Sequence, residues 1–243
     1  MIIQTEGIVL KTFDFRETSR IAFFFTKDYG KVKGILKGIR KDSKKFGSHI
    51  DKFSVNDLVY YQSRNSDLHL VSQCDLREYF FLVRQDYKRS LAANYALELI
   101  NTIMPPEQEN KEIYELVLEY LKSLGTIVDI DKLVYMFQIK TLLFSGFRPH
   151  LDCCVKCGKK VKARAQFSLK SGGLVCMHCP VDELHPTSIS QGAVASILHI
   201  ERSEWEKCLR LGLAASVKKE LKYILNHFLV YHLERQLKTA KYL

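Results

Sequence analysis

Hydrophobic residues in the first third of the chain gather in short runs that are separated by turn-forming residues. Runs of this length, rich in β-branched and aromatic side chains, are typical of β-strands. Asp28 and Gly30 favour a turn between two of the runs. We predict strands that include residues 7–10, 21–25, 32–36, 55–61 and 68–71. Five short strands within about 75 residues favour a small closed barrel, because closure removes exposed strand edges.

From Phe80 onward the hydrophobic residues recur at helical spacing instead. We predict helices over residues 91–104, 113–124 and 130–144, then near Ser190, at Trp205 and over 217–238. Pro105 and Gly146 are expected to end the first and the third of these helices. The pattern predicts an α+β multidomain protein: a five-stranded β-barrel in residues 1–78, then an all-α domain in residues 79–243 interrupted by a cysteine-rich insert at residues 152–180.

Four cysteines in this insert form two pairs. Cys154 and Cys157 are two residues apart, and Cys176 and Cys179 repeat this spacing eighteen residues later. Two intervening residues let a tight turn direct both sulfurs at one metal ion, and two such pairs complete a tetrahedron. Gly158, Gly172 and Gly173 give the backbone the freedom that these turns need. The spacing predicts one structural Zn²⁺ ion per chain, bound by Cys154, Cys157, Cys176 and Cys179.

Neighbouring side chains leave alternatives to this ligand set. Cys153 could replace Cys154, but two adjacent thiols rarely bind one ion without strain, so Cys154 is favoured. Four thiolates close the site, so His178 is expected to be exposed, and a catalytic zinc, which keeps a position open for water, is not expected. Cys74 and Cys208 are isolated and are predicted to be small buried hydrophobic side chains.

The net charge of the chain suggests a function for the barrel. The 243 residues include 37 Lys and Arg against 27 Asp and Glu, a formal net charge of +10. Such an excess favours an acidic partner. Nine of the cations lie between Lys27 and Lys52. A run of charge is usually only a solvated face, but this one accompanies a small barrel, a fold that often binds single strands along one face.

Individual residues of the barrel are predicted to contact nucleic acid. We predict phosphate contacts from Lys31, Lys33, Lys37, Arg40, Lys41, Lys44 and Lys45, with Arg16 and Arg20 as additions. Tyr29, Phe46 and Tyr61 are candidates for stacking on bases, whereas Phe23 and Phe25 are expected in the core. About five to seven phosphate contacts would make binding strongly salt-dependent.

The alternative is a zinc-stabilised interaction module whose basic face binds an acidic protein tail rather than DNA. The predicted helices over 113–124 and 217–238 could present a groove for such a tail, although core packing explains their apolar stripes equally well.

Sequence motifs for catalysis are missing. The chain has no phosphate-binding loop, no nucleophile elbow and no acidic cluster of a two-metal nuclease. A binding protein rather than an enzyme is therefore expected. No stretch approaches the roughly 20 apolar residues that span a bilayer, and the first residues lack the basic region of a signal peptide. We expect a cytoplasmic, nucleoid-associated protein without a membrane partner.

The ordered motifs resemble the bacterial RecO family of recombinational-repair proteins over essentially the whole chain. They are Gly7-Ile8-Val9-Leu10, the strand from Arg20 to Thr26, Tyr29-Gly30-Lys31, Lys37-Gly38-Ile39-Arg40, Phe46-Gly47, the segment from Leu151 to Gly158, the segment from Gly172 to Cys176, and His232-Leu233-Glu234-Arg235-Gln236-Leu237-Lys238. Each motif alone is weak, but in this order, with the cysteine pairs, they are specific.

The resemblance implies an OB-fold barrel followed by a helical domain that bears the zinc motif. It implies binding of single- and double-stranded DNA, annealing of complementary strands, and help in loading RecA onto DNA covered by single-strand-binding protein. The implied partners are RecR and the acidic C-terminal tail of single-strand-binding protein, with RecF and RecA acting indirectly. The family pattern Leu-Asp-x-Cys-x-x-Cys-Gly also places the first zinc ligand at Cys154.

Overall fold

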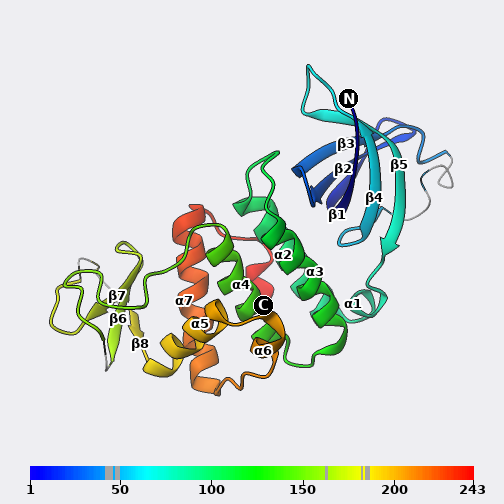
Figure 1. The fold of residues 1–243 in the computed structure, drawn as a ribbon. Coiled ribbons are helices and arrows are strands. Elements are labelled where there is room, and N and C mark those ends of the chain that lie inside the picture. The colour runs from blue at the N-terminus through cyan, green and yellow to red at the C-terminus, as the bar shows by residue number, and fades with distance from the viewer. Residues whose placement is uncertain (42–45, 47–49, 162–163, 182, 184–186) are drawn as a thin grey trace. The chain divides into compact units, whose positions relative to one another are not determined.

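The computed structural model describes residues 1–41, 46, 50–161, 164–181, 183 and 187–243 (Figure 1). Lys44 and Lys45, two of the predicted phosphate contacts, lie outside the described residues. The chain forms two compact units, Met1–Val128 and Asp129–Lys241, and its last two residues are divided between them. Strands give way to helices after Glu78, but the next three helices belong to the same compact unit as the barrel. A domain boundary at residue 78 stays a prediction.

The first unit contains the predicted five-stranded barrel, closed in the order β1-β2-β3-β5-β4. The strands are β1 (Ile2–Phe15), β2 (Ser19–Thr26), β3 (Gly30–Leu36), β4 (Val55–Tyr61) and β5 (Leu68–Glu78). All neighbouring pairs are antiparallel except β3 and β5. The expected OB-fold-like barrel is confirmed. Strands β1 and β5 exceed the predicted segments because their polar ends still pair with neighbouring strands.

Alternate side chains of each strand fill the barrel. Its core includes Val9, Phe24, Val32 and Leu58. The turn between β2 and β3 ends at Gly30, which has a φ of +63°, as its turn chemistry predicts, and a Cβ there would lie 2.2 Å from the backbone oxygen of Gln108. Only glycine fits this position, because the loop before α3 passes directly over it.

Three helices follow in the same unit: α1 (Phe81–Gln85), α2 (Tyr87–Ile103) and α3 (Lys111–Thr126). The two longer helices are confirmed but begin earlier than predicted, where Asp86 and Asn110 accept N-cap hydrogen bonds from Arg89 and Ile113. Helix α1 is too short to show a periodic pattern and was not predicted. The apolar stripe of α3 is buried, so packing explains it and it offers no groove.

The second unit contains α4 (Ile130–Phe144), α5 (Gln191–Arg202), α6 (Trp205–Leu209) and α7 (Ala215–Leu233), and a 3₁₀ turn, Ala240–Tyr242, lies near the end of the chain. Helix α4 spans the predicted residues, and Gly146 after it has a φ of +82°. Helix α7 ends before residue 238 because Glu234 adopts a left-handed conformation. Buried Lys140 of α4 donates to the backbone oxygen of Ser203 at 2.6 Å, which satisfies a carbonyl beyond the end of α5.

The cysteine segment contains a small sheet that was not predicted. Its strands are β6 (Ala165–Ser168), β7 (Gly173–Cys176) and β8 (Thr187–Ile189), in the order β7-β6-β8. Each has only three or four residues, too few for a recognisable alternation. Phe167 of β6 is buried and packs edge-on against Phe228 of α7, with 5.6 Å between the ring centroids.

Within the described part of the chain, every helix is too short or too polar to cross a membrane.

Candidate nucleic-acid interface and metal centre

One row of paired residues on the outer side of the barrel is apolar throughout. Cross-strand partners connect, in order, Ile2, Tyr61, Leu70, Ile35, Ile21 and Phe13. Phe13, Tyr61 and Leu70 are 45%, 47% and 37% exposed. The row faces outward, because the residues next to these in sequence fill the core. Ile2 is exposed as well, whereas Ile35 is half-buried and Ile21 is buried. Exposed apolar side chains gathered in this way are typical of a binding site.

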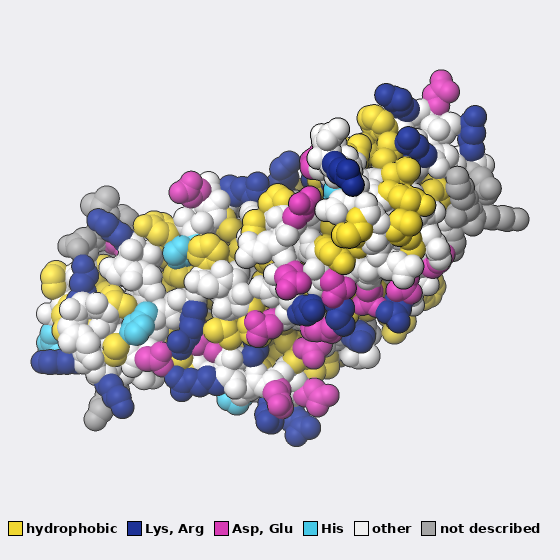
Figure 2. Space-filling model, turned by 45° about the horizontal axis from the view of Figure 1, so that its top comes forward, with side chains coloured by type: hydrophobic (Ala, Val, Ile, Leu, Met, Phe, Trp, Pro, Cys, Tyr) yellow, Lys and Arg dark blue, Asp and Glu magenta, His cyan; other side chains and the backbone are white. Residues whose placement is uncertain are grey.

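A second row lies beside the first and carries cations. It pairs Lys11, Phe23, Lys33 and Leu68 across β1, β2, β3 and β5. The Nζ atoms of Lys11 and Lys33 lie 4.1 and 5.8 Å from the centroid of the Phe23 ring, so an aromatic ring lies between two ammonium groups. Figure 2 shows apolar side chains gathered on the barrel with Lys and Arg next to them. The two rows together are called the barrel face.

Three of the predicted arginines come together where β1 turns into β2. The carboxylate of Asp14 lies 3.1 Å from Nε of Arg20 and 3.5 Å from Nε of Arg40. Arg40 also donates to the backbone oxygen of Arg16 at 3.2 Å. Each guanidinium group has five N–H donors, so both arginines held by Asp14 keep donors for a phosphate. The cluster lies at the adjoining ends of β1 and β2, where Asp14 and Arg20 pair one residue beyond Phe13 and Ile21.

The predicted lysines on this side differ in their surroundings. Lys33 forms an exposed ion pair with Asp67 at 3.3 Å, in the loop between β4 and β5. Such a pair contributes little to stability and can exchange for a phosphate. Lys37 and Lys41 follow β3 and are exposed to solvent.

Lys31 is the exception among the described candidates. Its Nζ donates to the backbone oxygen of Asn101 at 2.7 Å, in the last turn of α2, where a cation is favourable. Phe25, its partner across the strands, is fully buried and lies against Tyr114, with 6.0 Å between the ring centroids. Helices α2 and α3 therefore cover this end of β2 and β3, and Lys31 is left out of the proposed interface.

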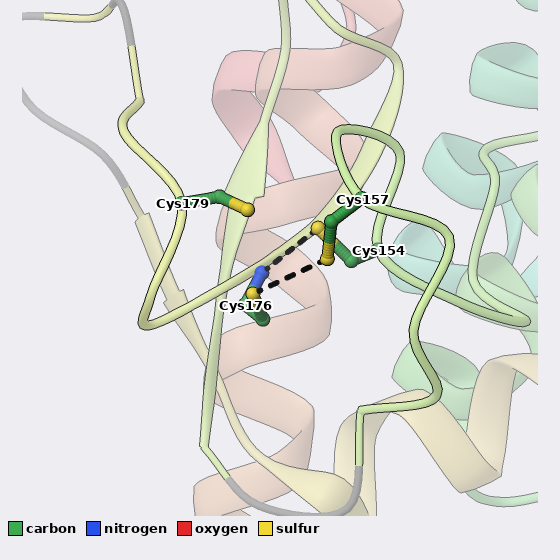
Figure 3. A group of neighbouring side chains, drawn as sticks. All are labelled: Cys154, Cys157, Cys176 and Cys179. Carbon is green, nitrogen blue, oxygen red and sulfur yellow. Dashed lines mark hydrogen bonds between the residues drawn. The ribbon is translucent and has the colours of Figure 1, made fainter.

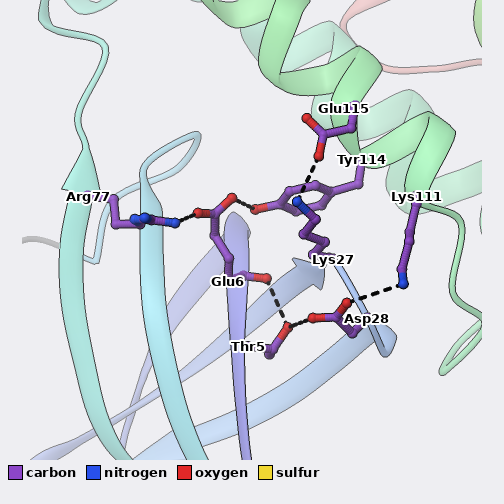
Figure 4. A network of polar contacts seen from close by, with 8 residues as sticks. All are labelled: Thr5, Glu6, Lys27, Asp28, Arg77, Lys111, Tyr114 and Glu115. Carbon is purple, nitrogen blue, oxygen red and sulfur yellow. Dashed lines mark hydrogen bonds and ion pairs between the residues drawn. The ribbon is translucent and has the colours of Figure 1, made fainter.

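Polar contacts fix α3 to the same end of the barrel (Figure 4). Glu6 of β1 lies between two partners, since it accepts from the hydroxyl of Tyr114 at 2.8 Å and pairs with Arg77. Burial raises the pKa of Tyr114, so its hydroxyl stays protonated and donates. Lys27 pairs with Glu115 at 3.0 Å. Part of the basic stretch, the cation-rich segment from Lys27 to Lys52, therefore holds helices rather than a ligand.

Lys31→Met is expected to lower the free energy of unfolding by about 1–2 kcal/mol, because a carbonyl loses a charged donor. Its affinity for single-stranded DNA should change less than that of Lys33→Met. The second substitution removes the same charge from the barrel face and should leave stability almost unchanged. Denaturant titration and fluorescence anisotropy of both variants measure the two effects. Equal losses of DNA affinity would contradict the assignment of Lys31 to α2.

The four predicted zinc ligands lie together in the second unit (Figure 3). Their sulfur atoms are all within 4.8 Å of one another, and those of Cys157 and Cys176 are 3.8 Å apart. Tetrahedral zinc with Zn–S bonds of about 2.3 Å places its sulfurs about 3.8 Å apart. The cluster is therefore compatible with a metal site of four thiolates.

Two tight turns build this cluster. The N–H of Gly158 donates to the oxygen of Cys154 at 2.9 Å, and that of Cys179 donates to the oxygen of Cys176 at 3.1 Å. Gly158 has the positive φ, +70°, that its place after the first pair predicted. Burial raises the pKa of the Cys154 thiol, but N–H groups including that of Cys176 outweigh it and lower this pKa to about 6. Hydrogen bonds of this kind stabilise a thiolate, the form that binds metal.

The segment with the first pair runs alongside β7, which brings the two pairs together. The N–H of Val155 donates to the oxygen of Leu174 at 2.8 Å, and that of Leu174 donates to the oxygen of His150 at 2.9 Å. A Cβ at Gly173 would lie 2.3 Å from that His150 oxygen, so the close approach requires glycine. The predicted need for glycine here is confirmed, although the reason is space rather than turn flexibility.

The other thiols are placed as expected. Cys153 is not part of the cluster, and its Sγ lies 3.0 Å from Nε2 of His150. His178 is exposed. Cys74 and Cys208 are fully buried.

Two expectations about aromatic residues are wrong. Phe46 is only 2% exposed and packs in the barrel core, so it cannot stack on a base. Phe23 is half-exposed on the barrel face and is not a core residue. Phe25 is buried as expected, and Tyr61 lies in the apolar row. The three consecutive phenylalanines of β2 place apolar side chains on both faces of the strand. Phe25 is buried and Phe23 is not, because α3 covers only Phe25.

Sequence reasoning did not select Lys11, Phe13, Ile35 or Leu70 for the barrel face. The pairing of the strands would have identified them, because each occupies an outward position opposite another apolar or cationic residue. Without the register this alignment cannot be seen, because the four residues lie on three different strands.

The fold and the site define a class of protein with an OB-fold-like barrel followed by a helical region that carries four clustered cysteines. Family models described as "Recombination protein O N terminal" and "Recombination protein O C terminal" match residues 1–80 and 84–241. The chain belongs to the recombination protein O (RecO) family, whose general role is that of a recombination mediator.

Individual relatives agree along nearly their whole length. The chain is 29% identical over 236 residues to DNA repair protein RecO of Alkaliphilus metalliredigens, covering 97% of this chain and 95% of that protein. It is 30% identical over 241 residues to DNA repair protein RecO of Caldicellulosiruptor bescii, covering 99% and 97%. The protein of the same name from Syntrophus aciditrophicus is 29% identical over 244 residues, covering 99% and 94%.

Proposed function

We propose that the barrel face binds single-stranded DNA, with bases on its aromatic side chains and phosphates on the cations beside them. The observation that carries this proposal is Phe23, half-exposed between the ammonium groups of Lys11 and Lys33. A single strand presents the flat, stacking faces of its bases and a charged phosphate at every nucleotide. OB-folds bind such strands with stacked aromatics in a basic groove. The strands and loops involved, β2, β3 and the turns after β1 and β4, are those that OB-folds use.

The proposed contacts extend from the face to the cations around it. Lys33, Lys37, Arg40 and Lys41 would hold phosphates, together with Arg16 and Arg20 at the turn after β1. Lys44 and Lys45 remain sequence-based candidates. Double-stranded DNA would bind through the same cations without stacking, because its bases are paired and covered.

The mechanism needs no covalent chemistry. Two complementary strands repel each other through their phosphates, and a surface that neutralises both lets base pairing proceed. We infer from family membership that the chain anneals strands in this way and, with RecR, helps to load RecA onto DNA covered by single-strand-binding protein, while RecF contributes indirectly.

A groove along α7 supports the inferred contact with single-strand-binding protein. It has a volume of about 640 Å³ and is lined by Lys219, Lys222, Tyr223, Ile224 and His227, among others. Glu220 also lines the groove, but its carboxylate accepts from the N–H of Ser190. Two lysines next to exposed and buried apolar side chains suit an acidic, partly hydrophobic tail. The predicted helix over 217–238 supplies these residues.

We also propose that Cys154, Cys157, Cys176 and Cys179 bind one structural Zn²⁺ ion. The distances between their sulfurs and the N–H donors that favour a thiolate support this assignment. When bound, the ion would close the two turns on each other and would have no position free for water.

Phe23→Ala tests the proposed base stacking. Losing one stacked base is expected to cost about 1–3 kcal/mol, a loss of affinity for single-stranded DNA of about 5-fold to 150-fold, with little change for duplex DNA. Phe81→Ala is the matched control, since Phe81 is 61% exposed on α1. Anisotropy with labelled oligo(dT) and with a duplex of the same length measures both. If Phe23→Ala bound oligo(dT) as tightly as the control, stacking on this face would be rejected.

The same assay separates the alternative function. An acidic peptide that bound the barrel face while oligo(dT) did not would make the protein an interaction module rather than a DNA-binding protein.

A further inference from the structure

The cysteine segment has a charge of its own, far along the chain from the basic stretch of the barrel. Between Asp152 and Pro180 the sequence holds six Lys and Arg residues and one acidic residue, Asp152. A zinc ion with four thiolates has a formal charge of −2, so it compensates only part of this excess. The segment remains basic with its metal bound.

The cations gather at one end of the β6–β7 hairpin. Lys159 and Lys160 follow the turn of the first cysteine pair, where the N–H of Cys154 donates to the oxygen of Lys159 at 2.9 Å. Arg164 directly precedes β6, and its neighbour Ala165 pairs with Cys176, which brings it to the same end. We call Lys156, Lys159, Lys160 and Arg164 the knuckle cations. All four are exposed.

Other arginines around the segment already form ion pairs. Arg148 pairs with Glu201 at 2.9 Å, and Arg202 pairs with Asp152 at 2.6 Å, so these arginines attach the segment to α5. Lys159, Lys160 and Arg164 form no ion pair with any other residue that the structure describes. Lysines without acidic partners on a rigid turn are suited to an external polyanion.

The second turn adds an uncharged surface at the same end. Met177 is 62% exposed, and His178 beside it is exposed as well. A thioether and an imidazole can both lie against a base or a sugar. Figure 2 shows Lys and Arg side chains around this part of the molecule, at the left of the view.

We propose that the knuckle cations form a second nucleic-acid contact, which binds the phosphate backbone of a strand without regard to sequence. The inference rests on the proposed DNA-binding function, but it concerns a different compact unit from the barrel face. One chain then has two separate surfaces for polynucleotide. The cysteine cluster serves DNA binding indirectly, by holding the backbone of the turn that presents these lysines.

The hairpin offers a control at its opposite end. Ser168 pairs with Gly173, so Lys170 lies in the turn that closes the hairpin away from the cysteines, and it is exposed. Lys122, at an exposed position of α3, supplies a second control charge. Lys159→Ser with Lys160→Ser is therefore compared with Lys122→Ser plus Lys170→Ser, since both double variants lose the same charge.

The experiment uses the full chain loaded with zinc, with metal content measured for each variant. Each double substitution is also introduced together with Phe23→Ala, which weakens the barrel face. Binding of oligo(dT) is followed by anisotropy across a salt series. With Phe23→Ala present, the knuckle variant is expected to bind at least threefold more weakly than the control, with a salt slope smaller by about 1.4. Annealing of complementary oligonucleotides should slow in parallel.

The outcomes separate the two proposals. If the unmodified chain did not bind oligo(dT), the proposed function itself would fail. If the unmodified chain bound it, and the knuckle variant matched its control in affinity and in salt slope with zinc still bound, the second contact would be rejected while the barrel face stood.

Discussion

Replacing Lys33, Lys37, Arg40 and Lys41 together by alanine is expected to weaken binding of single-stranded DNA by about two orders of magnitude at low salt. Lys33 belongs to the barrel face, and the other three follow β3. Among the described residues, their side-chain contacts are exposed ion pairs, one backbone contact and the ring of Phe23. The protein should therefore stay folded, since exposed pairs contribute little to stability. Anisotropy with oligo(dT) measures the affinity, and thermal unfolding checks the fold.

The salt dependence gives this prediction a second, independent readout. Each phosphate contact on a single strand contributes about 0.7 to the slope of log affinity against log salt, so the variant should have a slope smaller by about 2.8. Alanine at Lys88, Lys122, Lys170 and Lys207 gives a control of equal charge at exposed positions away from the face. A control that lost as much affinity would mean that net charge, rather than this surface, governs binding.

Cys176→Ser is expected to abolish stoichiometric zinc binding and to destabilise the second unit by on the order of 5 kcal/mol, because structural metal binding contributes directly to folding free energy. Cys176 ends β7, and its sulfur lies 3.8 Å from that of Cys157, so the substitution removes a thiolate that would link the two turns through the metal. Zinc content is measured by atomic absorption. Hydrogen exchange should show lost protection in β6, β7 and α5, with the strands of the barrel unchanged.

Cys153→Ser is the matched control for the metal site. Its thiol lies next to the first ligand but contacts His150 instead of the cluster. This variant should keep one zinc ion and its stability. A loss of zinc in Cys153→Ser with retention in a Cys154→Ser variant would reverse the ligand assignment.

Together, these two predictions assign different contributions to DNA binding to the two compact units. Removal of zinc should leave the contribution of the barrel face to DNA binding intact, because that face is built within residues 1–128. Only the smaller contribution of the knuckle cations should disappear with the metal. A zinc-free chain with an intact fold and no DNA binding at all would contradict this division.

The sequence determined most of the fold through local patterns. The strand 55–61 and the helix 130–144 coincide with β4 and α4, because each is bounded by residues that end regular structure, such as Gly146. Errors arose where an element is too short to show a period, as in α1 and β6 to β8. They also arose where one residue changes conformation, as Glu234 does at the end of α7.

The metal site was predictable from spacing alone because its ligands are close in sequence within each pair. Tight turns are local, so the distance between Cys154 and Cys157 follows from the chain itself. What spacing could not supply was the pairing of His150 and Val155 with β7, which brings the two pairs together over eighteen residues.

The sequence by itself determined the barrel, the helices, the four clustered cysteines and a basic stretch of the right charge. Only the tertiary structure decided which of those cations are free for a ligand. Lys31 and Lys33 are two residues apart on one strand and point the same way, yet the first is held by α2 and the second remains on the barrel face. The physical reason is that exposure depends on which helix covers a strand, and that packing joins residues about seventy positions apart, beyond any local pattern.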